Sequence, residues 1–175
     1  MSKIRKAAID HLRSTDIEQV KKGIAILEEQ GRPEQIQEIL EIYLQNNPGE
    51  TKKLLYELLS SISLKTAVPA WIETLRLKEF ILFRADIINI LWNTRLDFTP
   101  HLEFFVKLAC DLDYHGTLEC LTLIEQMEGP FQEHQLLECE LLLKEHVKKN
   151  KDEGDAKKHL ITMLATYINQ LTEDE

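Results

Sequence analysis

His115 and Glu119 are the two polar side chains whose types and spacing most directly suggest a joint role. They lie four residues apart, so in a helix they share one face, one turn apart. The chemistry open to them is a histidine–carboxylate pair, which on a helix surface is worth about 0.2–0.5 kcal/mol. The spacing predicts a contact, and an ordinary surface pair would account for it.

No catalytic or cofactor-binding motif accompanies this pair. The sequence has no GxGxxG, P-loop, HExxH, Glu-x-x-His or Gly-x-Ser-x-Gly pattern. No two of its six histidines share ligand spacing on one helix, and its three cysteines, Cys110, Cys120 and Cys139, include no CxxC pair. We therefore predict no cofactor and no metal site. We interpret the cysteines as buried free thiols, which fit a reducing compartment.

Asp86 is the candidate residue for an enzymatic alternative. Together with Trp71 and Trp92 it is similar to the aspartate and aromatic residues that a helical-repeat family of DNA glycosylases places in a groove. That family's groove is basic, whereas this chain has a net charge of −9. Because an acidic protein repels phosphate backbones, we do not expect nucleic acid as a partner. Core packing accounts better for both tryptophans.

The acidic charge is concentrated toward the C-terminus, where residues 101–175 hold seven Lys or Arg against sixteen Asp or Glu. We interpret this excess as a solubilising surface. No apolar run reaches the roughly 18 residues of a membrane span, and the charged N-terminus has no signal-peptide core. The sequence therefore predicts a soluble, cytoplasmic protein with one domain over residues 1–175, of which 172–175 form a frayed tail.

Helical periodicity covers the chain, and no strand pattern accompanies it. The central segment Phe80–Trp92 is apolar almost all the way round. It predicts a helix over residues 79–94 that its neighbours cover on several sides. Within it, Asp86, Asn89 and Asn93 fall in one narrow sector, which we expect to face water.

Four prolines mark restarts of the helical pattern. Pro33, Pro69, Pro100 and Pro130 are spaced 36, 31 and 30 residues apart, and each opens a predicted pair of helices. This period, with the segments VPAWIETL and TPHLEFFVKL, resembles the HEAT and armadillo-like α-α superhelices over about residues 15–172. The resemblance implies an all-α, right-handed superhelix of about five antiparallel helix pairs, a solenoid whose second helices line an inner surface.

Polar side chains recur on the second helices of this predicted stack. The residues of the central helix match Glu119, Thr122 and Gln126 at an offset of 33. An earlier helix contributes a similar polar line. The predicted polar face comprises Lys53, Glu57, Ser60, Asp86, Asn89, Asn93, His115, Glu119, Thr122 and Gln126. Its amide and carboxylate groups could meet the backbone of an extended peptide, although solvated helix faces have the same pattern.

Three functions fit these observations. The favoured one is a scaffold or adaptor that binds a protein or peptide through the polar face. The alternatives are an enzyme with a groove site near Asp86 and a helical regulatory domain that acts as a dimer through an exposed apolar patch. A deep pocket containing a perturbed carboxylate would favour the enzyme, and a broad shallow face would favour the scaffold.

Overall fold

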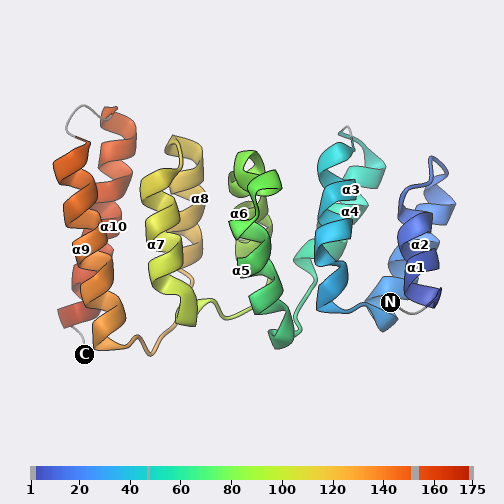
Figure 1. Ribbon diagram of the computed structural model, residues 1–175, viewed down its shortest axis with the longest axis horizontal. Coiled ribbons are helices and arrows are strands. Elements are labelled where there is room, and N and C mark those ends of the chain that lie inside the picture. Colours follow the sequence, from blue (N-terminus) through green and yellow to red (C-terminus); the bar gives the residue numbers. More distant parts are fainter. Residues whose placement is uncertain (1–2, 47, 151–153, 174–175) are drawn as a thin grey trace. The chain divides into compact units, whose positions relative to one another are not determined.

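The protein is all-helical over the ranges that the computed structural model describes, namely residues 3–46, 48–150 and 154–173. These ranges contain ten α-helices, four short 3-10 helices and no strand (Figure 1). The predicted all-α class is therefore confirmed. Each helix in the same ranges is too short or too polar to cross a membrane.

The chain divides into two compact units. Unit 1 comprises Met1–Phe83 and Asn93–Leu96, and unit 2 comprises Arg84–Trp92 and Asp97–Glu175. The helices of unit 1 are α1 (Lys3–Leu12), α2 (Ile17–Gln30), η1 (Pro33–Gln35), α3 (Ile36–Gln45), α4 (Glu50–Ser60), η2 (Lys65–Ala67), α5 (Val68–Arg76) and η3 (Lys78–Phe83). Those of unit 2 are α6 (Arg84–Asn93, except its last residue), η4 (Thr99–His101), α7 (Leu102–Asp111), α8 (Tyr114–Ile124), α9 (Glu133–Lys149) and α10 (Asp155–Glu173).

In unit 1 each helix packs against helices that are near it in the sequence. Helix α1 packs on α2 and α3 packs on α4, while α1 also contacts α3, α2 contacts α4, and α3 contacts α5. The approach of α1 to α2 is close at Gly23, where an added Cβ would lie 2.7 Å from the backbone oxygen of Ala8. Leu40 and Leu55, on the successive helices α3 and α4, are fully buried.

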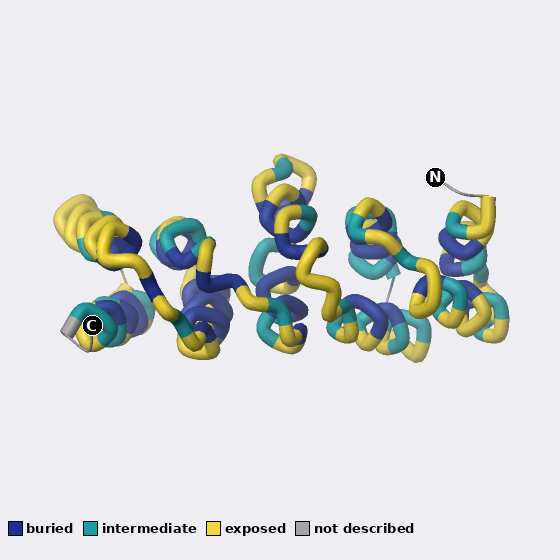
Figure 2. Tube along the Cα trace, turned by 90° about the horizontal axis from the view of Figure 1, so that it is seen from below, coloured by how far each residue is buried: buried dark blue, intermediate teal, exposed yellow. Residues whose placement is uncertain are grey.

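Unit 2 repeats this arrangement. Helix α7 packs on α8 and α9 on α10, while α7 contacts α9 and α8 contacts α10. The rings of Phe98 and Phe105 meet edge to face with centroids 5.6 Å apart. Figure 2 shows that the helices carry buried residues on one side and exposed residues on the other, as amphipathic helices do. Of the predicted frayed tail, residues 172 and 173 are helical, and residues 174–175 lie outside the described ranges.

Three of the four restart prolines begin helical segments as predicted. Pro33 opens η1, Pro69 lies in the first turn of α5, and Pro100 lies in η4. Pro130 differs, because it follows a cis peptide bond after Gly129, whose φ of 72° is left-handed. Helix α9 begins only at Glu133, so the predicted helix start at 130 is wrong.

The central apolar segment is not one buried helix. Its first part belongs to the 3-10 helix η3, and α6 begins only at Arg84. Ile81, Leu82 and Phe83 are exposed, Leu82 to 89%, and only Phe80 of η3 is buried. The prediction of a covered helix over 79–94 is wrong here, because successive residues of a tight connecting turn point in different directions and cannot all reach a core.

Candidate functional site

Glu119 of α8 is buried although it is charged, with 8% of its surface exposed. Its Oε2 accepts hydrogen bonds from Asn89 Nδ2 at 3.1 Å and from Trp92 Nε1 at 2.8 Å. Asn89 and Trp92 lie three residues apart on α6 and therefore share one face of that helix. A buried carboxylate needs such donors, since an unpaired one would be costly. Glu119 thus ties α6 to α8 within unit 2.

The second oxygen of this carboxylate faces His115. Glu119 Oε1 lies 3.7 Å from His115 Nε2, one turn earlier on α8, and this contact becomes an ion pair only when the histidine is protonated. The predicted contact is confirmed, but its description as an ordinary surface pair is wrong for one partner. His115 is exposed, whereas Glu119 is buried because α6 covers it.

Asp86, Thr122 and Gln126 extend this cluster along the two helices. Asp86 lies one turn before Asn89 and is exposed. Thr122 follows Glu119 by about one turn, is half-buried, and donates its hydroxyl proton to the Leu118 carbonyl at 3.0 Å. Gln126 is exposed just beyond the end of α8. The α6–α8 polar surface, as we name it, comprises Asp86, Asn89, His115, Glu119, Thr122 and Gln126.

The remaining predicted site residues belong to unit 1. Lys53 and Glu57 form an exposed ion pair of 3.8 Å on α4. Ser60 of the same helix is half-buried, and its hydroxyl has no hydrogen-bond partner among the described residues. Asn93 Nδ2 donates to Tyr56 Oη at 2.8 Å, also on α4. The predicted polar residues therefore form two groups, one within each unit.

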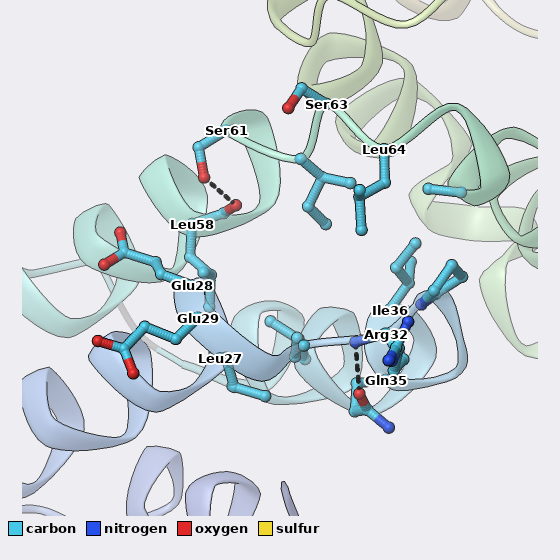
Figure 3. Close-up of a pocket in the computed structure, with 15 residues that line it drawn as sticks. Leu27, Glu28, Glu29, Arg32, Gln35, Ile36, Leu58, Ser61, Ser63 and Leu64 are labelled. Atoms are coloured by element: carbon cyan, nitrogen blue, oxygen red, sulfur yellow. Dashed lines mark hydrogen bonds between the residues drawn. The ribbon is translucent and has the colours of Figure 1, made fainter.

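A recess in unit 1 was not predicted from the sequence. It has a volume of about 490 Å³ and lies among the ends of α2 and α4, the start of α3, and the loop that follows α4 (Figure 3). The local sequence feature that indicates the recess is a pair of large apolar residues, Ile62 and Leu64, in a serine-containing loop. Because its walls come from segments distant in the sequence, no periodicity indicates it.

Two smaller cavities lie in unit 2. One of about 300 Å³ is lined by α9 and α10, including Leu143 and Ala165. The other, of about 270 Å³, is lined by residues around Thr99 and Gln135. Asp86 is exposed and lines neither these cavities nor the recess of unit 1.

The cysteine thiols are free, and burial suppresses the ionisation of Cys120 and Cys139. Cys120 and Cys139 are buried, as predicted, while Cys110 is half-buried. Burial raises the pKa of the Cys139 thiol to about 12 and also raises the pKa of the Cys120 thiol. Since the thiolate is the reactive form, Cys120 and Cys139 are inert as nucleophiles near neutral pH.

Comparisons of the chain with protein-family models, with curated proteins and with solved structures find no match. These comparisons identify no family and no repeat type. The function is therefore argued from the geometry of the described residues.

Proposed function

We propose that this chain is a protein-interaction module in which antiparallel helix pairs form a HEAT-like solenoid, and that the α6–α8 polar surface binds a peptide segment of a partner protein. Within unit 1 and within unit 2, first helices contact first helices and second helices contact second helices. This contact order is typical of stacked helical hairpins, and it supports the proposal.

The observation that carries the proposal is the fixed carboxylate of Glu119. Two hydrogen bonds from α6 hold its Oε2, so the polar groups at this junction are already ordered before any partner arrives. A surface that is ordered in advance loses less conformational entropy on binding. Exposed groups able to contact a peptide, Asp86, His115 and Gln126, flank the fixed carboxylate.

The chemistry of these exposed groups suits an extended peptide. Gln126 offers both a donor and an acceptor to a peptide backbone, Asp86 offers a carboxylate, and His115 offers a ring N–H donor. Three dissimilar polar groups, on α6, on α8 and just beyond the end of α8, fit a shallow contact better than they fit a catalytic centre.

Site-specific crosslinking tests the proposal. A photoreactive amino acid is placed at Gln126 and, as a matched control, at Gln45, an exposed glutamine of α3. Crosslinked partners are captured in an extract of the native cell and identified by mass spectrometry. The expected result is a protein that crosslinks at position 126 and not at position 45.

The purified partner is then tested by calorimetry against two triple variants. One is Asp86→Ala/His115→Ala/Gln126→Ala, and the control is Glu41→Ala/His159→Ala/Gln45→Ala, all of them exposed positions. The first triple should weaken binding by roughly tenfold or more, since three polar contacts are lost. Equal affinities for the two triples, with unchanged circular dichroism, would refute a binding role for the α6–α8 polar surface.

A specific observation favours the dimeric regulatory domain as a second candidate. Leu137, Leu141 and Val147 of α9 are exposed, the first two one turn apart. Val147 also borders the cavity between α9 and α10. If this row is a dimer interface, light scattering coupled to size exclusion should give twice the monomer mass, and Leu141→Lys should restore the monomer. A monomer at all concentrations would rule this candidate out.

A further inference from the structure

The recess of unit 1 has an apolar floor. Leu27, Ile36, Ile39, Leu58 and Ala67 line it, and each of these residues is itself buried. At about 490 Å³ the recess falls within the roughly 300–1,000 Å³ that ligand sites in proteins occupy. It can therefore accept one or two large apolar side chains.

An exposed apolar residue stands at the edge of the recess. Leu64 of the loop before η2 lines the recess, and 53% of its surface is exposed. Ile62 of the same loop is half-buried and also lines the recess. The apolar lining thus continues from the floor to the rim, where it would cover the outer side of an inserted side chain.

The charges around the recess are unequal. Glu28 and Glu29, in the last turn of α2, are exposed and make no ion pair with any described residue. Helices α2 and α4 also end at the recess, and the C-terminal end of a helix carries a partial negative charge. Arg32 is the cation of the lining, and Figure 3 shows it on the opposite side from the two carboxylates.

Arg32 is held in place by a hydrogen bond of its backbone. Its backbone N–H donates to Gln35 Oε1 at 2.8 Å, which holds the start of η1 against the rim (Figure 3). The Ser61 hydroxyl already donates to the Leu58 carbonyl at 2.8 Å. The rim therefore offers two carboxylates at one side and one guanidinium at the other, above an apolar floor.

We propose that this recess binds a short peptide segment of a partner protein in which large aliphatic side chains are followed by lysine or arginine. The aliphatic side chains occupy the floor and contact Leu64, and the basic side chains lie against Glu28 and Glu29. The Arg32 guanidinium donates hydrogen bonds to a carbonyl or carboxylate group at the other end of the segment. Charge complementarity selects this occupant over an acidic or purely apolar segment. The site lies in unit 1, and the α6–α8 polar surface of unit 2 is not needed for it.

The test uses the full chain, with leucine and isoleucine methyl groups labelled for NMR. It is titrated with three synthetic peptides: one in which leucines precede lysines, one with glutamates in place of the lysines, and one with serines in place of the leucines. The leucine–lysine peptide should shift the methyl signals of Leu27, Ile36 and Leu58 and leave those of Leu123 and Leu164 in unit 2 unchanged. The other two peptides should bind at least several-fold more weakly.

Two variants test the charges and the rim. Glu28→Lys/Glu29→Lys should weaken binding of the leucine–lysine peptide by about three- to tenfold, because two exposed ion pairs are lost. The matched control Glu41→Lys/Glu73→Lys changes the net charge equally at exposed positions outside the recess. Leu64→Ser, at an exposed loop position, should weaken binding without unfolding the chain.

Three results would overturn the proposal. They are equal binding of the glutamate peptide, an equal effect of the control pair of charge reversals, and peptide-induced shifts that fall outside the lining of the recess. The last result includes the case in which no lining signal shifts at any peptide concentration.

Discussion

Removal of the Glu119 carboxylate should destabilise unit 2 by several kcal/mol, although replacing a glutamate usually changes stability little. Glu119→Ala leaves Asn89 Nδ2 and Trp92 Nε1 without their acceptor. A hydrogen bond to a charged group contributes about 1.5–3 kcal/mol to stability. Both donor residues are half-buried, so water can partly replace the lost oxygen. We therefore expect a loss of about 2–4 kcal/mol in the free energy of unfolding.

Glu119→Gln removes the negative charge of the side chain but keeps an oxygen that can accept a hydrogen bond. The amide oxygen can still accept from Trp92 or Asn89, but it carries no negative charge, so a loss of about 1–2 kcal/mol is expected. Glu138→Ala is the control, because Glu138 is exposed on α9 of the same unit, and its effect should stay within about 0.5 kcal/mol.

Urea denaturation followed by circular dichroism measures these changes. Because a chain of two compact units need not unfold in one transition, hydrogen exchange of the backbone amides of α6 and α8 is followed as well. Exchange in both helices should accelerate in Glu119→Ala and remain unchanged in Glu138→Ala. If the Glu119→Ala and Glu138→Ala variants have the same unfolding free energy and exchange rates, the carboxylate is not the link between α6 and α8.

Three further predictions concern packing and ionisation. Gly23→Ala should destabilise the chain by about 1–2 kcal/mol despite alanine's higher helix propensity, because the new methyl group would meet the Ala8 backbone oxygen at 2.7 Å. Thermal denaturation checks this, with Gly154→Ala as the control because its methyl group would meet no atom within 4 Å. Because burial raises the pKa of the Cys139 thiol to about 12, the unfolded chain loses this proton first, and the free energy of unfolding should fall as pH rises above about 8.5. Urea titrations at alkaline pH should show a shallower fall for Cys139→Ala. Tyr56→Phe should cost no more than about 1 kcal/mol, since the exposed amide of Asn93 can turn to water, and a larger loss in urea denaturation would contradict this.

The helix starts could largely be predicted from local residue patterns, because proline restricts the backbone wherever it occurs. Pro33, Pro69 and Pro100 begin helical segments for this reason. The hydrogen bonds at the helix starts could not be predicted in the same way. A threonine before a first-turn proline is typical of a helix cap, yet the buried hydroxyl of Thr99 has no partner among the described residues, and its backbone N–H donates to Asp97 Oδ1 at 2.9 Å. The N–H of His101, which a threonine cap at position 99 would bind, donates instead to the Phe98 carbonyl at 2.8 Å, and local propensity does not predict this choice.

The candidate site depends on contacts between residues far apart in the sequence. The four-residue spacing of His115 and Glu119 predicted their contact, but only the approach of Asn89 and Trp92, about thirty residues earlier in the chain, buries the carboxylate. The apolar character of Leu82 likewise suggested burial, and its exposure follows from the turn in which it lies. Periodicity reports which side chains share a helix face, and it cannot report which face another helix will cover.

The two tryptophans differ in a way that makes each of them a spectroscopic label. Trp71 of unit 1 is fully buried and its indole nitrogen has no hydrogen-bond partner among the described residues, whereas Trp92 of unit 2 is half-buried and donates to a carboxylate. An indole in a dry apolar environment fluoresces at shorter wavelength than one beside polar groups and water. In Trp92→Phe the remaining tryptophan emission therefore belongs to unit 1, and in Trp71→Phe it belongs to unit 2. The unfolding of each unit can thus be followed separately by its tryptophan fluorescence.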